Sequence, residues 1–365
     1  MNIAICGTRG IPNNYGGFEQ CAEKIAVFFR DAGHTVTVYN TVEHPYKKDL
    51  WNDIIIIRPT QKVPSLPSFF REFYYDFSSL KDALSRGNDI ILELGYAPCS
   101  LFFFLKKRAK AKLVTNMAGM EWKRSKWNFF ARNIIRYCET LAVKGSDALI
   151  SDNPGIQKYF LDTYSKDSFY IPYGAEIFEN PDKLTLKDFN LIENKYFVLL
   201  ARFQPDNNIE VILDGYQSSG SDLPFLVIGS HQNKYGEYLK NKFKNNSGIR
   251  FVGGIYNYNI VSNLRWFSRL YFHGHSCGGT NPSLLEAMAS NSYIVSHDNI
   301  FNRSVLEENA FYFKTSNDVA QMIINYNPAN RDLFCSNNKK KVISEFNWEA
   351  VSESYLKAFA NVLGT

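Results

Sequence analysis

Two charged side chains, Arg202 and Glu286, follow predicted strands at positions where they could bind a phosphorylated ligand. Glu286 is the one acid in the apolar run Pro282–Met288, and its carboxylate could accept hydrogen bonds from ligand hydroxyl groups. Arg202 ends an apolar run, and its guanidinium could bind a diphosphate through two parallel hydrogen bonds. The simpler alternatives are a surface glutamate and a surface salt bridge.

The elements around Glu286 suit an anion. The sequence predicts a strand at 270–272, a glycine-rich loop at 273–281 and a helix that begins at Pro282. Proline fits the first helical position because its missing N–H would be unpaired there, and Asn281 can cap the helix. The free N–H groups of a helix start carry partial positive charge, so loop and helix together predict an anion site.

A second glycine pair, Gly16 and Gly17, precedes a helix predicted at 18–32. In a parallel sheet this loop faces the ligand crevice, so its backbone could approach a phosphate or a sugar. A turn that needs two glycines for its own geometry explains the pair equally well. The loop is not G-x-G-x-x-G, and the next strand ends at Asn40 without an acid, so a nicotinamide dinucleotide site is not favoured.

Apolar strands alternate with helical patterns along both halves of the chain. We predict strands at 2–6, 35–39, 54–57, 89–94, 112–116, 148–151 and 169–171, and then at 196–202, 225–229, 250–252, 270–272, 293–296 and 310–313. This order predicts an α/β protein with two doubly wound parallel sheets. The expected domains are 1–177 and 178–345, with a polar linker region at 178–195. A C-terminal helix at 346–365 is expected to pack back towards the first domain.

Composition narrows the function. The 365 residues suggest about two domains, and 41 Lys and Arg against 36 Asp and Glu give a net charge of only +5, which does not indicate nucleic-acid binding. The six cysteines are scattered without a C-x-x-C pair, which argues against a zinc site or disulfides and suits a reducing cytosol. We expect no signal peptide and no membrane-spanning segment.

The stretch Lys106–Arg136 contains ten basic residues and a single acid, Glu121, with aromatic residues between them. A second aromatic-rich stretch lies at 66–77. Basic and exposed aromatic side chains together predict a surface that lies on an anionic bilayer. The alternative is that the aromatic side chains are core and the cations a solvated rim. RNA binding is not favoured, because no known RNA-binding module is present.

The chain resembles family 4 glycosyltransferases over nearly its whole length. Within that family it resembles the rhamnosyltransferase-type branch of capsule and exopolysaccharide clusters. The resemblance implies the GT-B fold, in which two Rossmann-like domains face each other across a cleft. It also implies transfer of a hexose from a nucleotide sugar with retention of configuration, without a metal or another cofactor. The segments that carry it are Gly7-Thr-Arg-Gly-Ile-Pro12, Tyr15-Gly-Gly-Phe-Glu19, Glu121-Trp-Lys-Arg-Ser-Lys-Trp127, Ile171-Pro-Tyr-Gly-Ala175, Ala201-Arg-Phe-Gln-Pro-Asp-Asn-Asn208 and Gly274–Met288.

The resemblance also implies residue roles. Glu286 matches the second glutamate of the family's E-x7-E pattern, which binds the donor ribose, and Arg202 matches a phosphate-binding arginine. These two are the expected catalytic residues. The other expected donor-binding residues are Gly16, Gly17, Gly278, Gly279, Thr280, Asn281, Pro282 and Ser283. The expected acceptor-binding residues are Asn116, Glu121, Trp122, Lys123 and Arg124.

Three positions depart from the family pattern. Gly278 stands where the first glutamate belongs, Asn207 where a lysine belongs, and Ala118 where this branch is expected to have an acid. The rhamnosyltransferase-type branch shares the first two departures. They leave open a catalytically silent sugar-nucleotide-binding or scaffold protein, and a GT-B-like sugar-nucleotide epimerase.

The expected substrates follow from the resemblance as well. The donor would be dTDP-rhamnose first and UDP-sugars next, and the acceptor a lipid-linked saccharide or an oligosaccharide. We expect a cytoplasmic protein, peripheral to the inner face of the plasma membrane, with no nucleic-acid partner.

Overall fold

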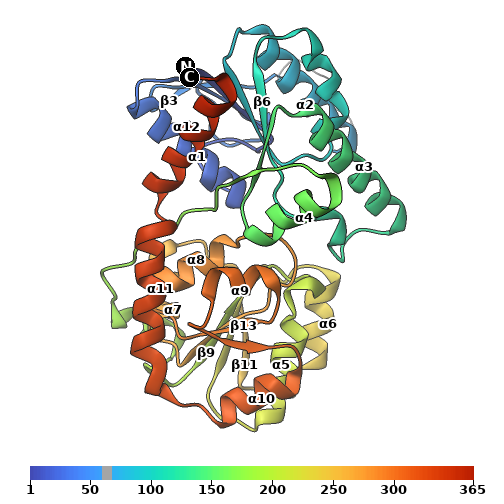
Figure 1. The fold of residues 1–365 in the computed structure, drawn as a ribbon. Coiled ribbons are helices and arrows are strands. Elements are labelled where there is room, and N and C mark those ends of the chain that lie inside the picture. The colour runs from blue at the N-terminus through green and yellow to red at the C-terminus, as the bar shows by residue number, and fades with distance from the viewer. Residues whose placement is uncertain (60–67) are drawn as a thin grey trace. The chain divides into compact units, whose positions relative to one another are not determined.

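The computed structural model describes residues 1–59 and 68–365 (Figure 1). The chain folds into two compact units. The first unit contains residues 1–123, 127–173 and 348–365, and the second contains residues 124–126 and 174–347. Each unit is built on one parallel or nearly parallel sheet with helices on both faces. The prediction of an α/β protein with two parallel sheets is therefore confirmed.

The first unit has an eight-stranded sheet in the order β3-β4-β2-β1-β5-β6-β7-β8. All neighbours pair in parallel except β3 and β4, which are antiparallel. The two-residue strand β3 was not predicted, because so short a segment has no detectable period. The strands are β1 (Asn2–Cys6), β2 (Thr35–Tyr39), β3 (Leu50–Trp51), β4 (Ile54–Ile57), β5 (Ile90–Leu94), β6 (Lys112–Asn116), β7 (Ala148–Ser151) and β8 (Phe169–Tyr170).

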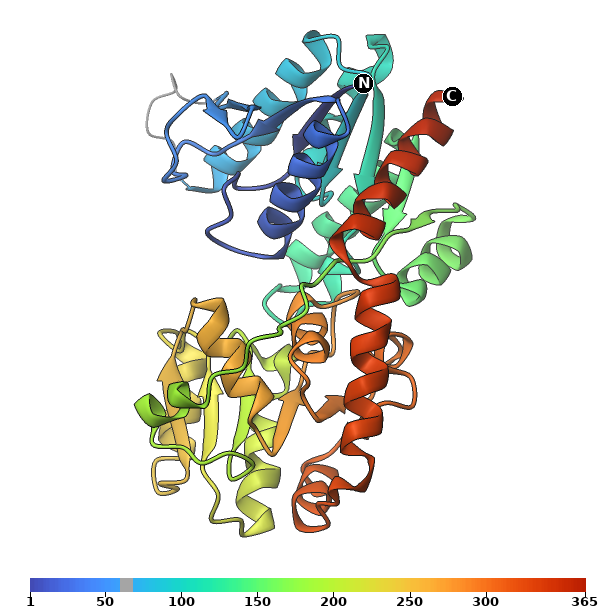
Figure 2. The same cartoon turned by 90° about the vertical axis from the view of Figure 1, so that its left-hand side faces the viewer.

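Helices cover both faces of this sheet. They are α1 (Gly17–Asp31), α2 (Ser68–Ser85), α3 (Phe129–Gly145), α4 (Pro154–Tyr164) and α12 (Trp348–Leu363), with 3-10 helices η1 (Cys99–Arg108) and η2 (Glu121–Lys123). The C-terminal helix α12 lies beside α1 on one face (Figure 2). The Phe29 ring meets the rings of Tyr355 and Phe359 there, with centroids 6.4 and 5.6 Å apart. The C-terminal helix therefore completes the first unit, although it follows the second along the chain.

The second unit has a six-stranded parallel sheet in the order β11-β10-β9-β12-β13-β14. Its strands are β9 (Phe197–Leu200), β10 (Phe225–Ile228), β11 (Ile249–Gly253), β12 (Leu270–His273), β13 (Ile294–His297) and β14 (Phe311–Phe313). Its helices are α5 (Ile209–Ser219), α6 (Lys234–Lys242), α7 (Tyr258–Trp266), α8 (Pro282–Ala289), α9 (Ile300–Leu306), α10 (Ser316–Ile324) and α11 (Arg331–Glu345). The 3-10 helices are η3 (Lys183–Phe189), η4 (Pro205–Asn207) and η5 (Pro328–Asn330).

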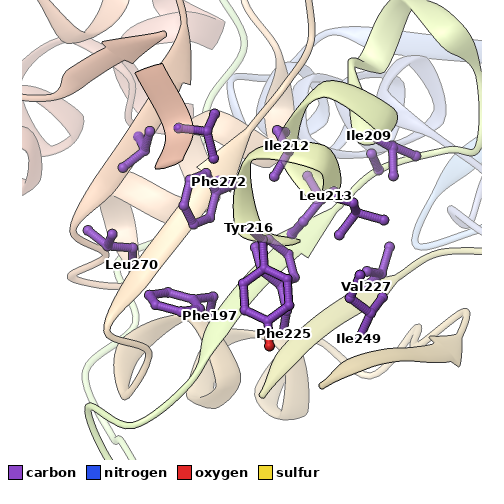
Figure 3. Close-up of a cluster of buried hydrophobic side chains, with 14 of the residues drawn as sticks. Phe197, Ile209, Ile212, Leu213, Tyr216, Phe225, Val227, Ile249, Leu270 and Phe272 are labelled. Atoms are coloured by element: carbon purple, nitrogen blue, oxygen red, sulfur yellow. The ribbon is translucent and has the colours of Figure 1, made fainter. Parts of the chain in front are cut away.

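A buried apolar cluster holds α5 against the second sheet (Figure 3). Ile209, Ile212, Leu213 and Tyr216 recur at helical spacing on one face of α5 and meet alternate residues of the strands. The rings of Phe197, Phe225 and Phe272, one from each of three strands, pack together with their centroids 5.3–6.1 Å apart. Each such buried side chain stabilises the fold by about 1.5–3 kcal/mol. The cluster fixes β9 and β12 side by side, so their carboxyl ends meet at one edge.

Candidate functional site

The start of α8 is built as the sequence predicts. Asn281 caps the helix, because its Oδ1 accepts hydrogen bonds from the Ser283 amide at 3.0 Å and from the Ser283 hydroxyl at 2.9 Å. Pro282 occupies the first turn. Gly278, three residues before the cap, has a φ of +104°, which favours glycine. Loop and helix start therefore present backbone N–H groups and the positive end of a helix dipole.

The glycine-rich loop is tied to the segment after β9. The amide of Asn208 donates to the Gly274 carbonyl at 2.8 Å, and the Ser276 N–H and hydroxyl donate to the Asp206 carbonyl at 3.0 and 2.8 Å. A Cβ on Gly274 would lie 2.0 Å from the Asn207 carbonyl oxygen, so this close approach of two backbones requires glycine. The structure thus places the Arg202 segment and the α8 loop at the same sheet edge.

Arg202 and Asn207 play different parts in this arrangement. The Arg202 side chain is exposed, while its carbonyl accepts hydrogen bonds from the Gln204 N–H at 2.8 Å and the Asn207 amide at 2.6 Å. Asn207 is buried, so its side chain holds the turn that presents Arg202. The residue that replaces the expected lysine therefore has a structural role here.

Two histidines lie at the end of β12 behind Arg202. The rings of His273 and His275 stack with their centroids 4.4 Å apart. Burial, together with the positive charges of Arg202 and Arg124, lowers the pKa of His275 to about 3, although Asp206 opposes this shift. Burial lowers the pKa of His273 as well. Both imidazoles are thus neutral near pH 7 and add no cationic charge to the site.

Residues 124–126 pack within the second unit. A guanidinium nitrogen of Arg124 lies 3.9 Å from the Asp206 carboxylate, and the Ser125 hydroxyl donates to the same carboxylate. A Cβ on Gly278 would lie 3.7 Å from Arg124 Nη2. Arg124, predicted to bind the acceptor, therefore lies beside the glycine-rich loop.

Glu286 projects from the second turn of α8 and is not alone. Its Oε2 accepts a hydrogen bond from Arg265 Nη1 at 2.9 Å. The Arg265 side chain is 0 % exposed and that of Glu286 is 22 % exposed. Sequence reasoning missed Arg265, which comes from α7. The one signal was its place four residues after Val261, on the apolar face of that helix.

The loop around Gly16 and Gly17 lies at the carboxyl end of β1 in the first unit. Gly16 has extended backbone and precedes α1. The buried carboxylate of Glu19 accepts a hydrogen bond from the Arg9 N–H at 2.9 Å, and the Arg9 guanidinium stacks 3.5 Å above the Tyr15 ring. Glu19, in the first turn of α1, therefore orders the loop before its own helix.

The residues of the first unit that were predicted to bind the acceptor differ in burial and in the contacts of their side chains. Asn116 is buried, and its amide donates to the Tyr355 hydroxyl at 3.0 Å while its oxygen accepts from the Ala118 N–H at 3.0 Å. Glu121 accepts a hydrogen bond from the Trp127 indole at 3.2 Å. The Lys123 ammonium, which is exposed, lies 5.4 Å from the ring centre of Trp122.

Trp122 is hydrogen-bonded to a buried acid, Glu139, that the sequence analysis did not single out. Its indole N–H donates to Glu139 Oε2 at 3.2 Å, and the hydroxyls of Tyr159 and Tyr164 donate to Glu139 Oε1 at 2.6 and 2.8 Å. Glu139 is fully buried. These donors satisfy its carboxylate, so Glu139 orients Trp122 from behind.

Two more acids, buried Glu93 and partly buried Asp76, lie near the carboxyl end of β1. Glu93, on β5, is buried, and a Cβ on Gly7 would lie 2.6 Å from its Oε1. Burial raises the pKa of Glu93 well above its usual range, and the charge of Asp76 adds to this. Burial also raises the pKa of Asp76, on α2, to about 8. These carboxyl groups therefore hold protons at a pH where free acids are ionised.

The basic and aromatic stretch forms an exposed surface on α3. Phe129 and Phe130, at the start of the helix, are 74 and 77 % exposed, and Ile134 and Tyr137 continue this face. Arg132 and Arg136 are exposed on the same helix. Leu66 and Pro67 of the other aromatic stretch lie outside the described residues, as do the side chains of Lys107 and Arg108. At α3, then, aromatic side chains lie at the surface instead of in the core.

Across residues 1–59 and 68–365, no three His, Cys, Asp or Glu side chains are grouped so that they could hold a metal ion. None of the helices in these residues is long and apolar enough to span a bilayer.

Comparison with known families matches the two halves separately. Residues 182–325 match the family model described as Glycosyl transferases group 1, and residues 1–176 match a domain of unknown function, DUF1972. No curated protein matches the chain in sequence. Residues 182–325 of the second unit are therefore similar to glycosyl transferases group 1 domains.

Solved structures share the whole fold. Sucrose-phosphate synthase from Thermosynechococcus elongatus superposes with a TM-score of 0.83 at 16% identity, covering 100% of this chain and 99% of that one. HepE from Anabaena, in complex with UDP and glucose, gives 0.78 at 15% identity, covering 99% and 100%. WaaG, a glycosyltransferase involved in lipopolysaccharide biosynthesis, gives 0.72 at 16% identity and 100% of both chains. The expected GT-B fold is confirmed.

Proposed function

We propose that this protein is a retaining glycosyltransferase that binds a nucleotide sugar in its second unit and transfers the sugar to a lipid-linked saccharide or an oligosaccharide. One observation carries the proposal: exposed Arg202 lies at the same sheet edge as the Asn281-capped start of α8. A fixed cation and a helix N-terminus at one edge are what a diphosphate requires. The family match of residues 182–325 supports the same activity.

The chemistry asked of this site is electrostatic. When the glycosidic bond to the donor phosphate breaks, negative charge develops on the departing nucleoside diphosphate. Arg202 and the N–H groups at the start of α8 stabilise that charge, since they are held in place before the reaction. We include no metal ion in this role. The acceptor hydroxyl oxygen bonds to the anomeric carbon from the face that the leaving group vacates, with retention, and its proton passes to the departing phosphate oxygen.

We propose dTDP-rhamnose as the donor, with UDP-sugars as the alternatives. The support for rhamnose is the resemblance of the motifs to the rhamnosyltransferase-type branch. The support for UDP-sugars is that HepE was solved with UDP and glucose. Involvement of WaaG in lipopolysaccharide biosynthesis favours a cell-surface saccharide as the acceptor.

We also propose that the protein is cytoplasmic and docks on the inner face of the plasma membrane through α3. The exposed rings of Phe129 and Phe130 can enter the headgroup region, and Arg132 and Arg136 can meet anionic lipids. Such docking would bring the protein to a lipid-linked acceptor.

A second candidate is a catalytically silent protein that binds a sugar nucleotide. Three residues support this candidate. Gly278 stands where the family pattern has its first glutamate, and Ala118 stands where an acid is expected. Asn207 stands where a lysine is expected, and its buried side chain cannot act as that lysine. This candidate predicts nucleotide binding without transfer. An epimerase of the same fold predicts conversion of the donor without any acceptor.

The test is a donor panel with membrane lipid extract as the acceptor: dTDP-rhamnose, UDP-glucose, UDP-galactose, UDP-N-acetylglucosamine and GDP-mannose. Mass spectrometry identifies any glycosylated lipid. The matched variants are Arg202→Ala and Arg250→Ala, because Arg250 lies near the amino end of β11 and donates to the Phe189 carbonyl. We expect Arg202→Ala to lower turnover about a hundredfold and Arg250→Ala to leave it unchanged. Transfer that is equal in both variants would refute the assignment of Arg202.

A further inference from the structure

Arg265 is the largest fully buried side chain of the protein's described part, and it points at the site. Its Nη1 donates to Glu286 Oε2 at 2.9 Å, and its Nη2 donates to the Ser283 carbonyl at 3.3 Å. Its Nε is buried and has no hydrogen-bond partner among the described residues. One guanidinium from α7 thus holds both the acid of α8 and the first turn of that helix.

Stability alone does not explain this arrangement. A guanidinium stays charged, and burying it costs free energy that one ion pair repays poorly. Apolar residues of similar volume commonly stabilise a core at least as well as a buried pair. The unpaired Nε adds a further cost. Buried Arg265 contacts Glu286, the one acid of α8, beside the helix start that we assign to the diphosphate. The effect of Arg265 on Glu286 therefore explains its burial better than stability does.

The effect on Glu286 is geometric. With Oε2 held on the side of α7, the carboxylate loses its rotational freedom and Oε1 takes a fixed direction. The Glu286 side chain keeps 22 % of its surface exposed, whereas that of Arg265 has none. Part of the Glu286 side chain is therefore open to a ligand, whereas the guanidinium of Arg265 is not. A preset acceptor oxygen of this kind selects for a hydroxyl group in one place.

We propose that Arg265 is a positioning residue: through Glu286 it sets the recognition of a single hydroxyl on the pentose of the donor nucleotide. This rests on the proposed function, because it takes the ligand to be a nucleoside diphosphate sugar. Arg265 does not touch the ligand. Its consequence is selectivity between nucleotides that differ in their pentose hydroxyls, including ribose against 2′-deoxyribose.

The test measures binding of UDP, 2′-deoxy-UDP and 2′,3′-dideoxy-UDP by calorimetry to the full chain. In the unaltered protein we expect about a tenfold loss of affinity at the step that removes the recognised hydroxyl, as for a hydrogen bond to a charged group. In Arg265→Met we expect that step to shrink to about twofold or less. The control is Arg331→Met, since the Arg331 guanidinium donates to the carbonyls of Trp266, Ser268 and Arg269. It should keep the tenfold step.

A merely structural role gives a different result, in which Arg265→Met weakens all three nucleotides by the same factor. That outcome would overturn the proposal. Should Arg265→Met fail to fold, the pair Arg265→Leu with Glu286→Leu removes both charges at once. We expect it to fold and to bind the three nucleotides without discrimination, while retained discrimination would overturn the proposal. If the unaltered protein binds none of the three and does not bind dTDP either, the proposed function itself has failed.

Discussion

Replacing Asp76 by asparagine should stabilise the first unit in a manner that depends on pH. Burial raises the pKa of Asp76 to about 8, whereas an aspartate in an unfolded chain has a pKa of about 4. Between these values the folded protein holds a proton that the unfolded chain has released. The free energy of unfolding therefore falls as the pH rises through this window, by about 1.4 kcal/mol per pH unit for one group.

The magnitude over an accessible range follows directly. From pH 6 to pH 8 the loss approaches about 2.5 kcal/mol, and the slope flattens above pH 8 where the folded form also ionises. For a unit of this size the loss corresponds to roughly 5–10 °C in Tm. The amide of an asparagine carries no titrating proton, so the Asp76→Asn variant should lose that dependence. Glu93, whose pKa is raised as well, leaves a residual slope of the same sign.

The assay is differential scanning calorimetry of the unaltered protein, Asp76→Asn and Asp167→Asn at several values between pH 5 and pH 8. Asp167 is exposed on the segment before β8, so its variant should track the unaltered protein. The Tm of Asp76→Asn should rise relative to both as the pH increases. Parallel Tm curves for all three proteins would refute the assignment of a proton to Asp76.

Three other predictions concern the second unit and α3. Acid should destabilise the second unit between pH 6.5 and 4, because burial and nearby arginines lower the pKa of His275 to about 3 and it gains a proton only on unfolding; His275→Gln should lessen the fall in Tm, and an unchanged fall would contradict this. Gly278→Ala should weaken UDP or dTDP binding about tenfold, since a φ of +104° strains alanine by about 1–3 kcal/mol. Gly220→Ala, with a φ of +65° at the end of α5, should lower Tm without changing that affinity, and equal affinities for both variants would count against the loop. Phe129→Ser with Phe130→Ser should reduce co-sedimentation with phosphatidylglycerol vesicles severalfold, whereas Leu161→Ser on α4, which is 49 % exposed, should not; equal binding by both would remove α3 from the membrane proposal.

The fold could be predicted from local pattern because strands buried on both faces are apolar throughout. β1, β2, β4, β6 and β7 begin and end where the sequence predicts. The sheet edge that carries Arg202 and the glycine-rich loop was predictable for a different reason: parallel strands bring their carboxyl ends to one edge. The roles of Arg202, Glu286 and the glycine-rich loop in binding a donor remain predictions that the experiments above test.

The sequence could not predict contacts between residues that only the tertiary structure brings together. Arg265 lies 21 residues before Glu286 in the chain, and only the packing of α7 on α8 brings its guanidinium to that carboxylate. Likewise, nothing local distinguishes Asp76 or Glu139 from surface acids, because their shielding from solvent depends on elements far away in the chain. The short strand β3 is defined by its antiparallel pairing with β4 and not by its own two residues.

The most direct test of the central claim is a crystal structure of the full chain with UDP or dTDP bound. We predict that the diphosphate lies within hydrogen-bond distance of the Arg202 guanidinium and of the backbone N–H groups at the start of α8, and that a pentose hydroxyl lies on Glu286. A nucleotide bound elsewhere, with Arg202 and the start of α8 unoccupied, would contradict it.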